Sequence, residues 1–265
     1  MSANQPPVLL EHYLKQLRLP TVLRDYASLA AVCSKERCDY PTYLLRLVER
    51  ELLDRERRAA ARRVKAARFP VVKTLDSFDF TAQPSINQAL IRELMGGAYL
   101  DQRENLLFLG NSGTGKTHLA CALGFAACGQ GRRVRFFSAL ALVTLLLESR
   151  EERHLQRLLG QLQQQELLIL DELGYVPFSK AGAELLFEVV SRAYERNSLI
   201  VTSNLPFEQW TEVLGSERLT GALLDRLTHR VHIIEANGES YRLRESKRRQ
   251  QRRRRGADPE SGSGS

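Results

Sequence analysis

The sequence has few cysteines and no long apolar run, and each absence excludes a class of protein. The four cysteines fit neither a disulfide framework nor paired CxxC metal knuckles; Cys121 and Cys128, seven apart in an expected helix, are interpreted as small buried apolar residues. No apolar stretch approaches the roughly 20 residues that span a bilayer, which predicts a protein with no membrane span. The first residues lack a basic segment followed by an apolar one, so we expect no secretory signal and a cytoplasmic location.

Charge is distributed unevenly along the chain. The formal net charge of +8 hides two basic arms: residues 55–68 hold seven basic residues against one glutamate, and residues 244–255 hold eight against one. The rest of the chain is mildly acidic. Blocks of like charge often bind nucleic acid, and we single out Arg62 and Arg63 in the first arm for DNA contact. A solvated charged face is the alternative interpretation.

Aromatic residues show no pattern of single-strand recognition. The single tryptophan, Trp210, and the scattered tyrosines do not form a series on which successive bases would stack. No recognition helix or base-reading motif is visible either. We therefore expect contact with the backbone of duplex DNA, largely independent of sequence and sensitive to salt.

The composition of the chain changes near residue 70. Residues 1–70 show helical patterns, the longest over 43–68 after the break at Pro41, and predict a small helical domain for partner or DNA docking and oligomer contacts. Pro70 blocks a helix, and the chain around it turns extended. Residues 71–248 form the second predicted domain. Residues 249–265 begin basic and end in a low-complexity stretch that we expect to be disordered.

Apolar strand-like runs alternate with helical patterns in the second domain. In chain order the runs are NLLFLG, RVRFFS, ELLILDE, SLIVTSN and VHIIEA. Strands that are apolar on both faces and separated by helices imply a parallel sheet covered on both sides. The sequence therefore predicts the α/β class with a three-layer architecture.

A glycine-rich loop follows the first of these runs and precedes a helical pattern. It fits GxxxxGK[ST], in which inward-turned backbone N–H groups and the dipole of the helix N-terminus hold an anionic polyphosphate. Lys116 would neutralise the β- and γ-phosphates, and the Thr117 hydroxyl would ligate Mg²⁺. His118, directly after the loop, is interpreted as helix surface or nucleotide-adjacent, without a catalytic role. The residues predicted to bind the nucleotide are Gly110, Asn111, Ser112, Gly113, Thr114, Gly115, Lys116, Thr117 and His118.

Two acids end the third apolar run. Asp171 stands at the carboxyl end of a buried strand, where open α/β sheets present ligands, and would hold Mg²⁺ through water. Glu172 follows immediately. A carboxylate beyond the metal ligand suits a base that orients or activates water, so the pair favours hydrolysis over transfer to a second substrate. The alternative is that the two acids simply end a strand.

Asn204 ends the fourth apolar run. A neutral amide there would hydrogen-bond both the attacking water and the γ-phosphate, and would report the nucleotide state to the sheet. Asparagine before a loop is also a common turn residue, so the sequence leaves a sensor and a turn as alternatives.

These motifs in this order, followed by ALLDRLTHRVHIIEANGESYRLRESK, resemble the AAA+ ATPases of the initiator and helicase-loader branch. The resemblance is to the IstB-type transposition helper ATPases of bacterial insertion sequences first, and to DnaC-type helicase loaders next. It extends over about residues 10–248, including DYASLA and KTLDSFDF. It implies a P-loop AAA+ domain that binds and hydrolyses ATP and assembles into an ATP-dependent homo-oligomer, either a ring or a helix.

The resemblance also implies roles for two arginines. In that family the arginine within LLDRL acts on the nucleotide of a neighbouring subunit, which implies an arginine finger at Arg226. The arginine in GESYR serves as a second sensor in its own subunit, which implies Arg242, although Arg244 lies two residues further on. From the residues alone, a guanidinium matches phosphate oxygens, but Arg226 could equally belong to a salt-bridged surface helix.

Members of the family carry an extra helical element between the second and third strands, which controls assembly or grips DNA. The matching stretch is residues 138–165. Within it Arg150, Arg153 and Arg157 follow the i, i+3, i+7 spacing of one helix face, while leucines take another side. We therefore expect a basic stripe that contacts a DNA backbone, with a solvated surface as the alternative.

The combined expectation is an ATP-dependent DNA-binding protein that assembles on duplex DNA and assists transposition by selecting or remodelling target DNA and recruiting its cognate transposase. Two alternatives use the same ATPase: a loader of replicative helicase, and a nucleotide-switched DNA scaffold with slow hydrolysis. The first 70 residues discriminate transposition from helicase loading, because they would dock either transposase or helicase. A small-molecule kinase is disfavoured, because Glu172, a finger in trans and basic arms do not make an acceptor pocket.

Overall fold

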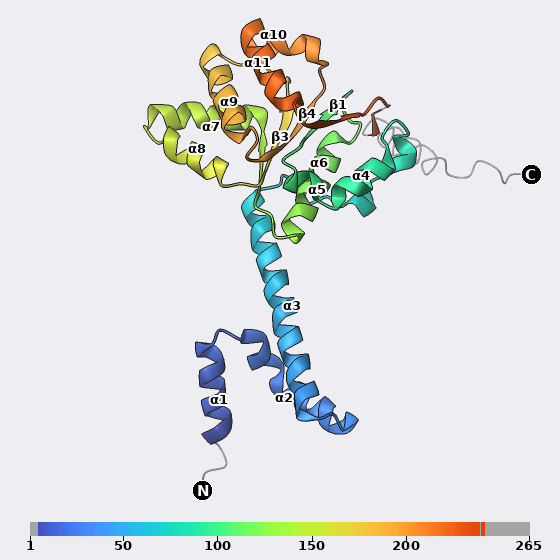
Figure 1. The fold of residues 1–265 in the computed structure, drawn as a ribbon, viewed down its shortest axis with the longest axis vertical. Coiled ribbons are helices and arrows are strands. Elements are labelled where there is room, and N and C mark those ends of the chain that lie inside the picture. Colours follow the sequence, from blue (N-terminus) through green and yellow to red (C-terminus); the bar gives the residue numbers. More distant parts are fainter. Residues whose placement is uncertain (1–4, 239, 242–265) are drawn as a thin grey trace, which may run out of the picture. The chain divides into compact units, whose positions relative to one another are not determined.

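The computed structural model describes residues 5–238 and 240–241, and the chain forms two compact units, residues 1–62 and 63–265. Helices alone make the first unit, and a sheet with helices makes the second (Figure 1). The division falls within a long helix, before the boundary expected at residue 70. The last turn of that helix belongs to the second unit, where Ala67 is fully buried. That residues 1–70 and 71–248 are separate domains stays a prediction.

Three helices form the first unit as expected, with one difference at a helix start. They are α1 (Gln5–Gln16), α2 (Pro20–Glu36) and α3 (Tyr40–Ala67). A proline stands in the first turn of each of the three helices, where its missing N–H removes no hydrogen bond of the helix. Because Pro41 is accommodated in this way, α3 begins at Tyr40 and not at residue 43, and the expected break at Pro41 is a helix start.

Few side chains of the first unit are fully buried. A small apolar cluster is centred on Leu29, Cys33 and Leu47. Beside it, the buried Glu51 carboxylate accepts hydrogen bonds from the Thr21 backbone N–H at 2.8 Å and from an Arg58 Nη at 3.0 Å. The Glu51 carboxylate on α3 therefore caps the first turn of α2 and connects the two helices.

The second unit is built on a five-stranded parallel sheet in the order β2-β3-β4-β1-β5. The strands coincide with the five apolar runs, so the predicted α/β fold with a parallel sheet is confirmed. Strand bounds are β1 (Asn105–Leu109), β2 (Val134–Ser138), β3 (Leu167–Leu173), β4 (Ser198–Ser203) and β5 (Val231–Glu235).

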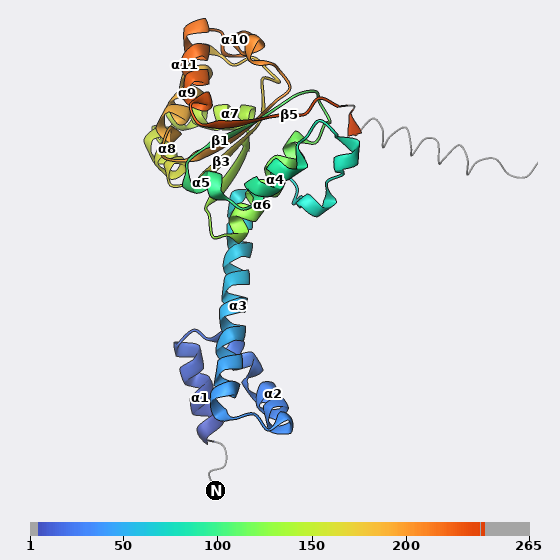
Figure 2. The same ribbon diagram turned by 45° about the vertical axis from the view of Figure 1, so that its right-hand side comes forward.

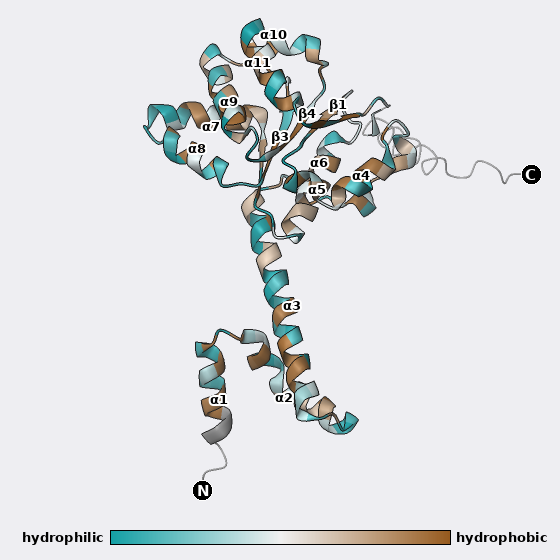
Figure 3. Cartoon of the chain, viewed as in Figure 1, coloured by the Kyte–Doolittle hydropathy of each residue, from teal (hydrophilic) through white to brown (hydrophobic). Residues whose placement is uncertain are grey.

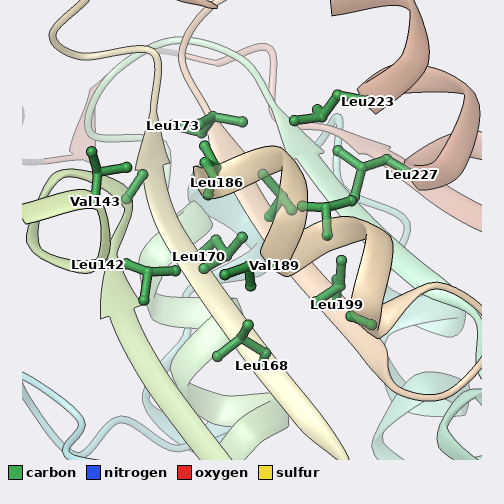
Figure 4. Close-up of a cluster of buried hydrophobic side chains, with 14 of the residues drawn as sticks. Leu142, Val143, Leu168, Leu170, Leu173, Leu186, Val189, Leu199, Leu223 and Leu227 are labelled. Atoms are coloured by element: carbon green, nitrogen blue, oxygen red, sulfur yellow. The ribbon is translucent and has the colours of Figure 1, made fainter. Parts of the chain in front are cut away.

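Helices cover both faces of this sheet (Figure 2). Successive strand residues point to opposite faces, so Leu168 and Leu170 join one apolar cluster while Leu167 and Ile169 join the other. Figure 4 shows the cluster around Leu168 and Leu170. The helices are α4 (Gln88–Met95), α5 (Ala98–Asp101), α6 (Lys116–Gly129), α7 (Ala139–Glu151), α8 (Leu155–Gln163), α9 (Lys180–Ala193), α10 (Trp210–Leu214) and α11 (Glu217–Thr228), with 3₁₀ helices η1 (Leu75–Ser77), η2 (Phe80–Ala82) and η3 (Phe207–Gln209).

The helices α7, α9 and α11 pack on the face with Leu168, and α6 and α4 pack on the face with Ile169. Both clusters reach the central strands, and Trp210 is buried in the first. This double covering explains why the strands are apolar on both faces. No helix in the described part of the chain has the length and apolar character that a membrane span requires.

The insert between β2 and β3 differs from its expected form. It consists of two helices, α7 and α8, because the chain turns between them at Arg153, whose φ is 59°. The spacing of Arg150, Arg153 and Arg157 therefore does not describe one face of one helix, and that prediction is wrong. The three side chains lie on α7, on the turn and on α8, and all are exposed.

The segment between α3 and α4 folds irregularly against the second unit. It holds η1 and η2 and no strand, although its composition suggested extended chain. The Asp79 carboxylate accepts hydrogen bonds from the backbone N–H groups of Thr81 and Ala82 and so caps η2. This local capping replaces the pairing that an extended segment would need.

Candidate active site

The glycine-rich loop joins β1 to the N-terminus of α6. Gly110, Gly113 and Gly115 have φ of 136°, 79° and 94°, a region that L side chains rarely adopt. A Cβ on Gly115 would also collide with the Phe78 ring. The loop therefore needs glycine at these positions, and it ends at a helix N-terminus whose positive dipole favours an anion.

Lys116 is the first residue of α6 and only 8% exposed. Its Nζ donates hydrogen bonds to the carbonyl oxygens of Gly110 and Asn111 at 2.6 and 2.7 Å. Thr114 Oγ1 donates to the same Asn111 oxygen at 2.9 Å. These bonds hold the ammonium group inside the loop, which is the place where it can neutralise a bound phosphate.

Asp171 and Glu172 are adjacent on β3 but their environments differ. Asp171 is 6% exposed and its Oδ1 accepts hydrogen bonds from Thr117 Oγ1 at 2.9 Å and Thr202 Oγ1 at 2.6 Å. Glu172 is exposed, and its φ of 58° lies in the left-handed region. Its backbone N–H donates to the same Thr202 hydroxyl at 2.9 Å. One hydroxyl on β4 therefore fixes the carboxylate of the first acid and the backbone of the second.

A cavity of about 600 Å³ brings these groups together. Such a volume is within the range of small-molecule and nucleotide pockets. Asn204, directly after β4, lines it together with both acids. The phenylalanines and tyrosines of the wall are Phe78, Phe136, Tyr175 and Tyr241, and the predicted loop residues on it are Ser112, Gly113, Thr114, Gly115, Lys116, Thr117 and His118.

His118 joins the irregular segment to the cavity wall. Its Nε2 lies 3.0 Å from the carbonyl oxygen of Thr74 and 3.2 Å from Ser77 Oγ, and its ring packs edge-on against Phe78. Burial lowers the pKa of His118, more than the bond to Thr74 raises it, so the ring is neutral at pH 7. The residue therefore holds the wall in place, which agrees with a nucleotide-adjacent position without a catalytic role.

Several residues of the site were not found from the sequence, and two of them, Thr202 and Phe78, contact predicted site residues directly. Thr202 is a buried hydroxyl within an apolar strand, two residues before Asn204, and that polarity was a signal for a hydrogen-bonded role. Phe78 lies more than thirty residues before the loop that it contacts, and nothing in its neighbourhood indicates that contact. Both depend on which segments the fold brings side by side.

Arg226 lies on α11 and is not among the residues that line the cavity. Its guanidinium carbon is 4.6 Å from the centre of the Phe187 ring, and its Nη1 donates to the carbonyl oxygen of Ala222 at 2.7 Å. The side chain is half-buried in this position. Arg242, the expected second sensor, lies outside the described residues, as does the basic arm at 244–255.

The arginines predicted to contact DNA have different surroundings. Arg63 Nε donates to the carbonyl oxygen of Cys128 at 2.7 Å, which anchors this side chain on α6. The other four side chains are exposed, namely Arg62, Arg150, Arg153 and Arg157. Cys121 and Cys128 are buried as expected; burial raises the pKa of Cys121 to about 12 and that of Cys128 to about 11.

The fold and the cavity together define a class of protein. The phosphate loop follows β1, the acid pair lies on β3, and Asn204 follows β4, the strand between β1 and β3 in the parallel sheet. This is the arrangement of a P-loop ATPase of the AAA+ class. The ATPase expected from the motifs is confirmed by this arrangement together with the comparisons below.

Comparison with known proteins narrows the class to a family. The profile described as IstB-like ATP binding protein matches residues 12–249. The ATP-binding protein of insertion sequence IS5376 from Geobacillus stearothermophilus is 38% identical over 92% of this chain and 98% of that relative. The corresponding protein of insertion sequence IS21 from Pseudomonas aeruginosa is 41% identical over 90% of each. The chain belongs to the IstB-like ATP binding protein family, and the resemblance seen in the sequence is confirmed.

Solved structures share the fold of a large part of this chain. The replication initiator DnaA, bound to AMPPCP and single-stranded DNA, superposes with a TM-score of 0.54 at 21% identity. The superposition covers 70% of this chain and 56% of that one. A likeness at this identity shows the AAA+ fold alone.

Proposed function

We propose that the protein is the ATP-hydrolysing subunit of an oligomer that assembles on duplex DNA and assists transposition by selecting or remodelling target DNA and recruiting the cognate transposase. The relatives named above are ATP-binding proteins of insertion sequences, which supports the link to transposition. The basic composition of residues 55–68 and the exposed arginines of α7 and α8 support contact with a DNA backbone.

Magnesium completes the nucleotide site in this proposal. Mg²⁺ prefers oxygen ligands, and the Thr117 hydroxyl already lies within hydrogen-bond distance of the buried Asp171 carboxylate on the cavity wall. Thr117 and Asp171 would hold the ion, which supplies neutralising charge to the phosphates when bound. Lys116, at the same loop, would supply a further positive charge.

Hydrolysis requires a water molecule held against the γ-phosphate. Glu172 is an exposed carboxylate on the cavity wall and would accept the proton of that water, because two hydroxyls occupy Asp171 and the Asp79 carboxylate, on the same wall, caps η2. The Asn204 amide, on the same wall, would hydrogen-bond the water and hold it in line. We thus assign metal binding to Asp171 and proton acceptance to Glu172 in this proposal.

The observation that carries the oligomeric part of the proposal is the position of Arg226. Within the described residues no arginine lines the nucleotide cavity, and the Arg226 guanidinium stacks on Phe187 outside it. A guanidinium that stabilises the charge of the transition state would therefore come from Arg226 of a neighbouring subunit. Assembly would then control hydrolysis, because an isolated subunit would lack this group.

Electron microscopy of the protein with duplex DNA and a non-hydrolysable ATP analogue tests assembly directly. The proposal expects rings or helical filaments with the analogue and none without nucleotide, and ATP turnover that rises when duplex DNA is added. Glu172→Gln is the matched control, because it keeps every phosphate and metal contact: it should assemble like the parent and turn over slowly. Single subunits that hydrolyse ATP at a rate independent of protein concentration and of DNA would contradict the proposal.

A further inference from the structure

A second cavity of about 600 Å³ lies in the second unit, away from the nucleotide site. Its walls are β2, the helices α7 and α8 of the insert, and the last residues of α3. None of its lining residues is shared with the nucleotide cavity, so the nucleotide does not account for it.

The charge of this cavity is of one sign. Arg68, Arg135 and Arg157 line it, and no aspartate or glutamate of the described residues does. Within the described part of the chain, none of these three guanidinium groups lies within 4 Å of a carboxylate. His154, also on the wall, is exposed and lies 3.7 Å from the Glu152 carboxylate. Among the described residues, the three arginines therefore line one cavity without a carboxylate partner.

Arg135 is the innermost of the three. It is half-buried on β2, its guanidinium carbon lies 5.1 Å from the centre of the Phe137 ring, and its Nη1 donates to the carbonyl oxygen of Ala66 at 2.8 Å. Burial lowers the pKa of Arg135, and the positive charge of Arg68 lowers it further. A charge held in this way is stabilised when an anion enters the cavity.

We propose that this cavity binds a phosphate group and that the DNA backbone supplies it, an inference that rests on the DNA binding proposed above. Guanidinium groups donate paired hydrogen bonds that match phosphate oxygens, and side chains from three separate elements would fix one phosphate in position. The glutamines on α8 and after it, of which Gln161, Gln164 and Gln165 line the cavity, provide further donors. The site would set the register of the insert on the duplex without reading its sequence.

The test compares two pairs of substitutions of equal charge in the full chain. Arg68→Gln with Arg157→Gln removes two exposed cavity arginines and leaves Arg135, which caps α3. Arg92→Gln with Arg218→Gln removes two exposed arginines of α4 and α11 that do not line the cavity. Affinity for a duplex oligonucleotide is measured against salt concentration for the parent and both pairs.

A second measurement uses inorganic phosphate as the probe. Melting temperature is recorded in sodium phosphate and in sodium chloride of equal ionic strength, in a Lys116→Ala background that removes the phosphate-loop lysine. We expect phosphate to raise the melting temperature of this background and of the control pair, and not of the cavity pair. This arm does not depend on DNA, so it tests the cavity even if the protein fails to bind DNA and the proposed function is wrong.

For DNA, the slope of log affinity against log salt should be shallower in the cavity pair by about 0.9, the change expected for one lost phosphate contact, with a smaller change in the control pair. That result supports the proposal. If the slope is unchanged while the phosphate effect is lost, the cavity binds phosphate from another source and the DNA assignment is overturned. If both are unchanged in the cavity pair, the cavity is not a phosphate site.

Discussion

The two units of this protein use their apolar residues in opposite ways. In the ATPase unit, apolar side chains are buried on both faces of the sheet, and Trp210 is 1% exposed. In the N-terminal unit, hydrophobic residues recur along the first half of α3 (Figure 3), yet many are exposed. The exposed large apolar residues of the N-terminal unit are Val8, Leu9, Leu10, Tyr13, Leu17, Val32, Tyr40, Leu44, Leu45, Val48, Leu52 and Leu53.

The ATPase unit is therefore stabilised by its own apolar core, whereas the N-terminal unit has an exposed apolar surface. Soluble monomers rarely expose apolar patches of more than a few hundred Å², and larger ones mark interaction sites. The exposed residues of α3 therefore support the proposal that the first unit contacts other protein, and the buried clusters of the ATPase unit support rigid placement of the catalytic groups. Changes in one unit should thus be silent in the other until the protein assembles.

The largest effect is expected at Lys116. Lys116→Ala should weaken ATP binding by about 100-fold or more, because a buried charge that meets the phosphates is removed. Lys180→Ala is the matched control, since Lys180 is also the first residue of its helix but is exposed and lines no part of the cavity. Calorimetric titration with ATP measures both. Equal affinity in the two variants would show that the loop does not bind phosphate.

A smaller effect is expected at Thr202, whose hydroxyl joins the two acids. Thr202→Val keeps the shape of the side chain and removes both hydrogen bonds, so kcat should fall about 10–100-fold while ATP affinity changes little. Thr202→Ser restores the hydroxyl and should restore most of the rate. Steady-state kinetics over a range of magnesium concentration give the split between kcat and KM. A Val variant as active as the Ser variant would leave Thr202 without a positioning role.

Stability gives a direct comparison of the two units. Leu142 is fully buried in the ATPase unit, and Leu142→Ala should destabilise that unit by about 2–5 kcal/mol. Leu52 is 53% exposed, and Leu52→Ala should change stability by less than about 0.5 kcal/mol. The single tryptophan, Trp210, reports unfolding of the ATPase unit alone, so urea unfolding followed by its fluorescence measures both variants. Equal shifts would mean that the exposed face of α3 stabilises the ATPase unit.

The smallest effect is a difference in labelling rate among the four cysteines, two in each unit. Cys121 and Cys128 are buried with pKa raised to about 12 and 11, so few thiolates form and an alkylating reagent should modify them last. Cys38 is only half-buried, and although burial also raises its pKa, it should be modified first. Mass spectrometry over a time course follows each residue. Early labelling of Cys121 would show that the ATPase unit opens as readily as the first unit.

Strands and catalytic motifs could be predicted from the sequence because each is local. The five apolar runs became β1–β5, and the loop around Lys116 and the pair Asp171 and Glu172 lie on one cavity. Contacts between segments could not be predicted. The hydroxyl of Thr202 meets Asp171 only because β4 is placed beside β3 in the sheet order, which periodicity does not reveal.

The break between α7 and α8 could not be predicted from the sequence either. Residues 139–163 have a helical pattern throughout, and the turn at Arg153 has no glycine or proline to announce it. The turn lets Leu159 and Leu162 of α8 join the apolar cluster around Leu168 and Leu170. Burial in the fold therefore places the turn, which local helix propensity does not determine. The second cavity is a product of the same turn and for that reason was not foreseen.

The central claim is that hydrolysis needs Arg226 of a neighbouring subunit, and mixing two inactive variants tests it most directly. Glu172→Gln subunits keep the finger and lose the base, while Arg226→Ala subunits keep the pocket and lose the finger. Mixed oligomers would contain interfaces with both groups. Because an arginine finger contributes on the order of 10³–10⁵ in rate, the mixture should hydrolyse ATP well above the sum of its parts.

The matched control mixes Arg226→Ala with a Glu172→Gln, Arg226→Ala double variant, in which no interface has both groups, and it should stay inactive. Co-assembly of the two proteins on DNA is confirmed by differential labelling before turnover is measured. Rescue in the first mixture and none in the second is the predicted result. If the co-assembled single variants show no rescue, Arg226 acts within its own subunit or only in structure, and the claim of hydrolysis across an interface is contradicted.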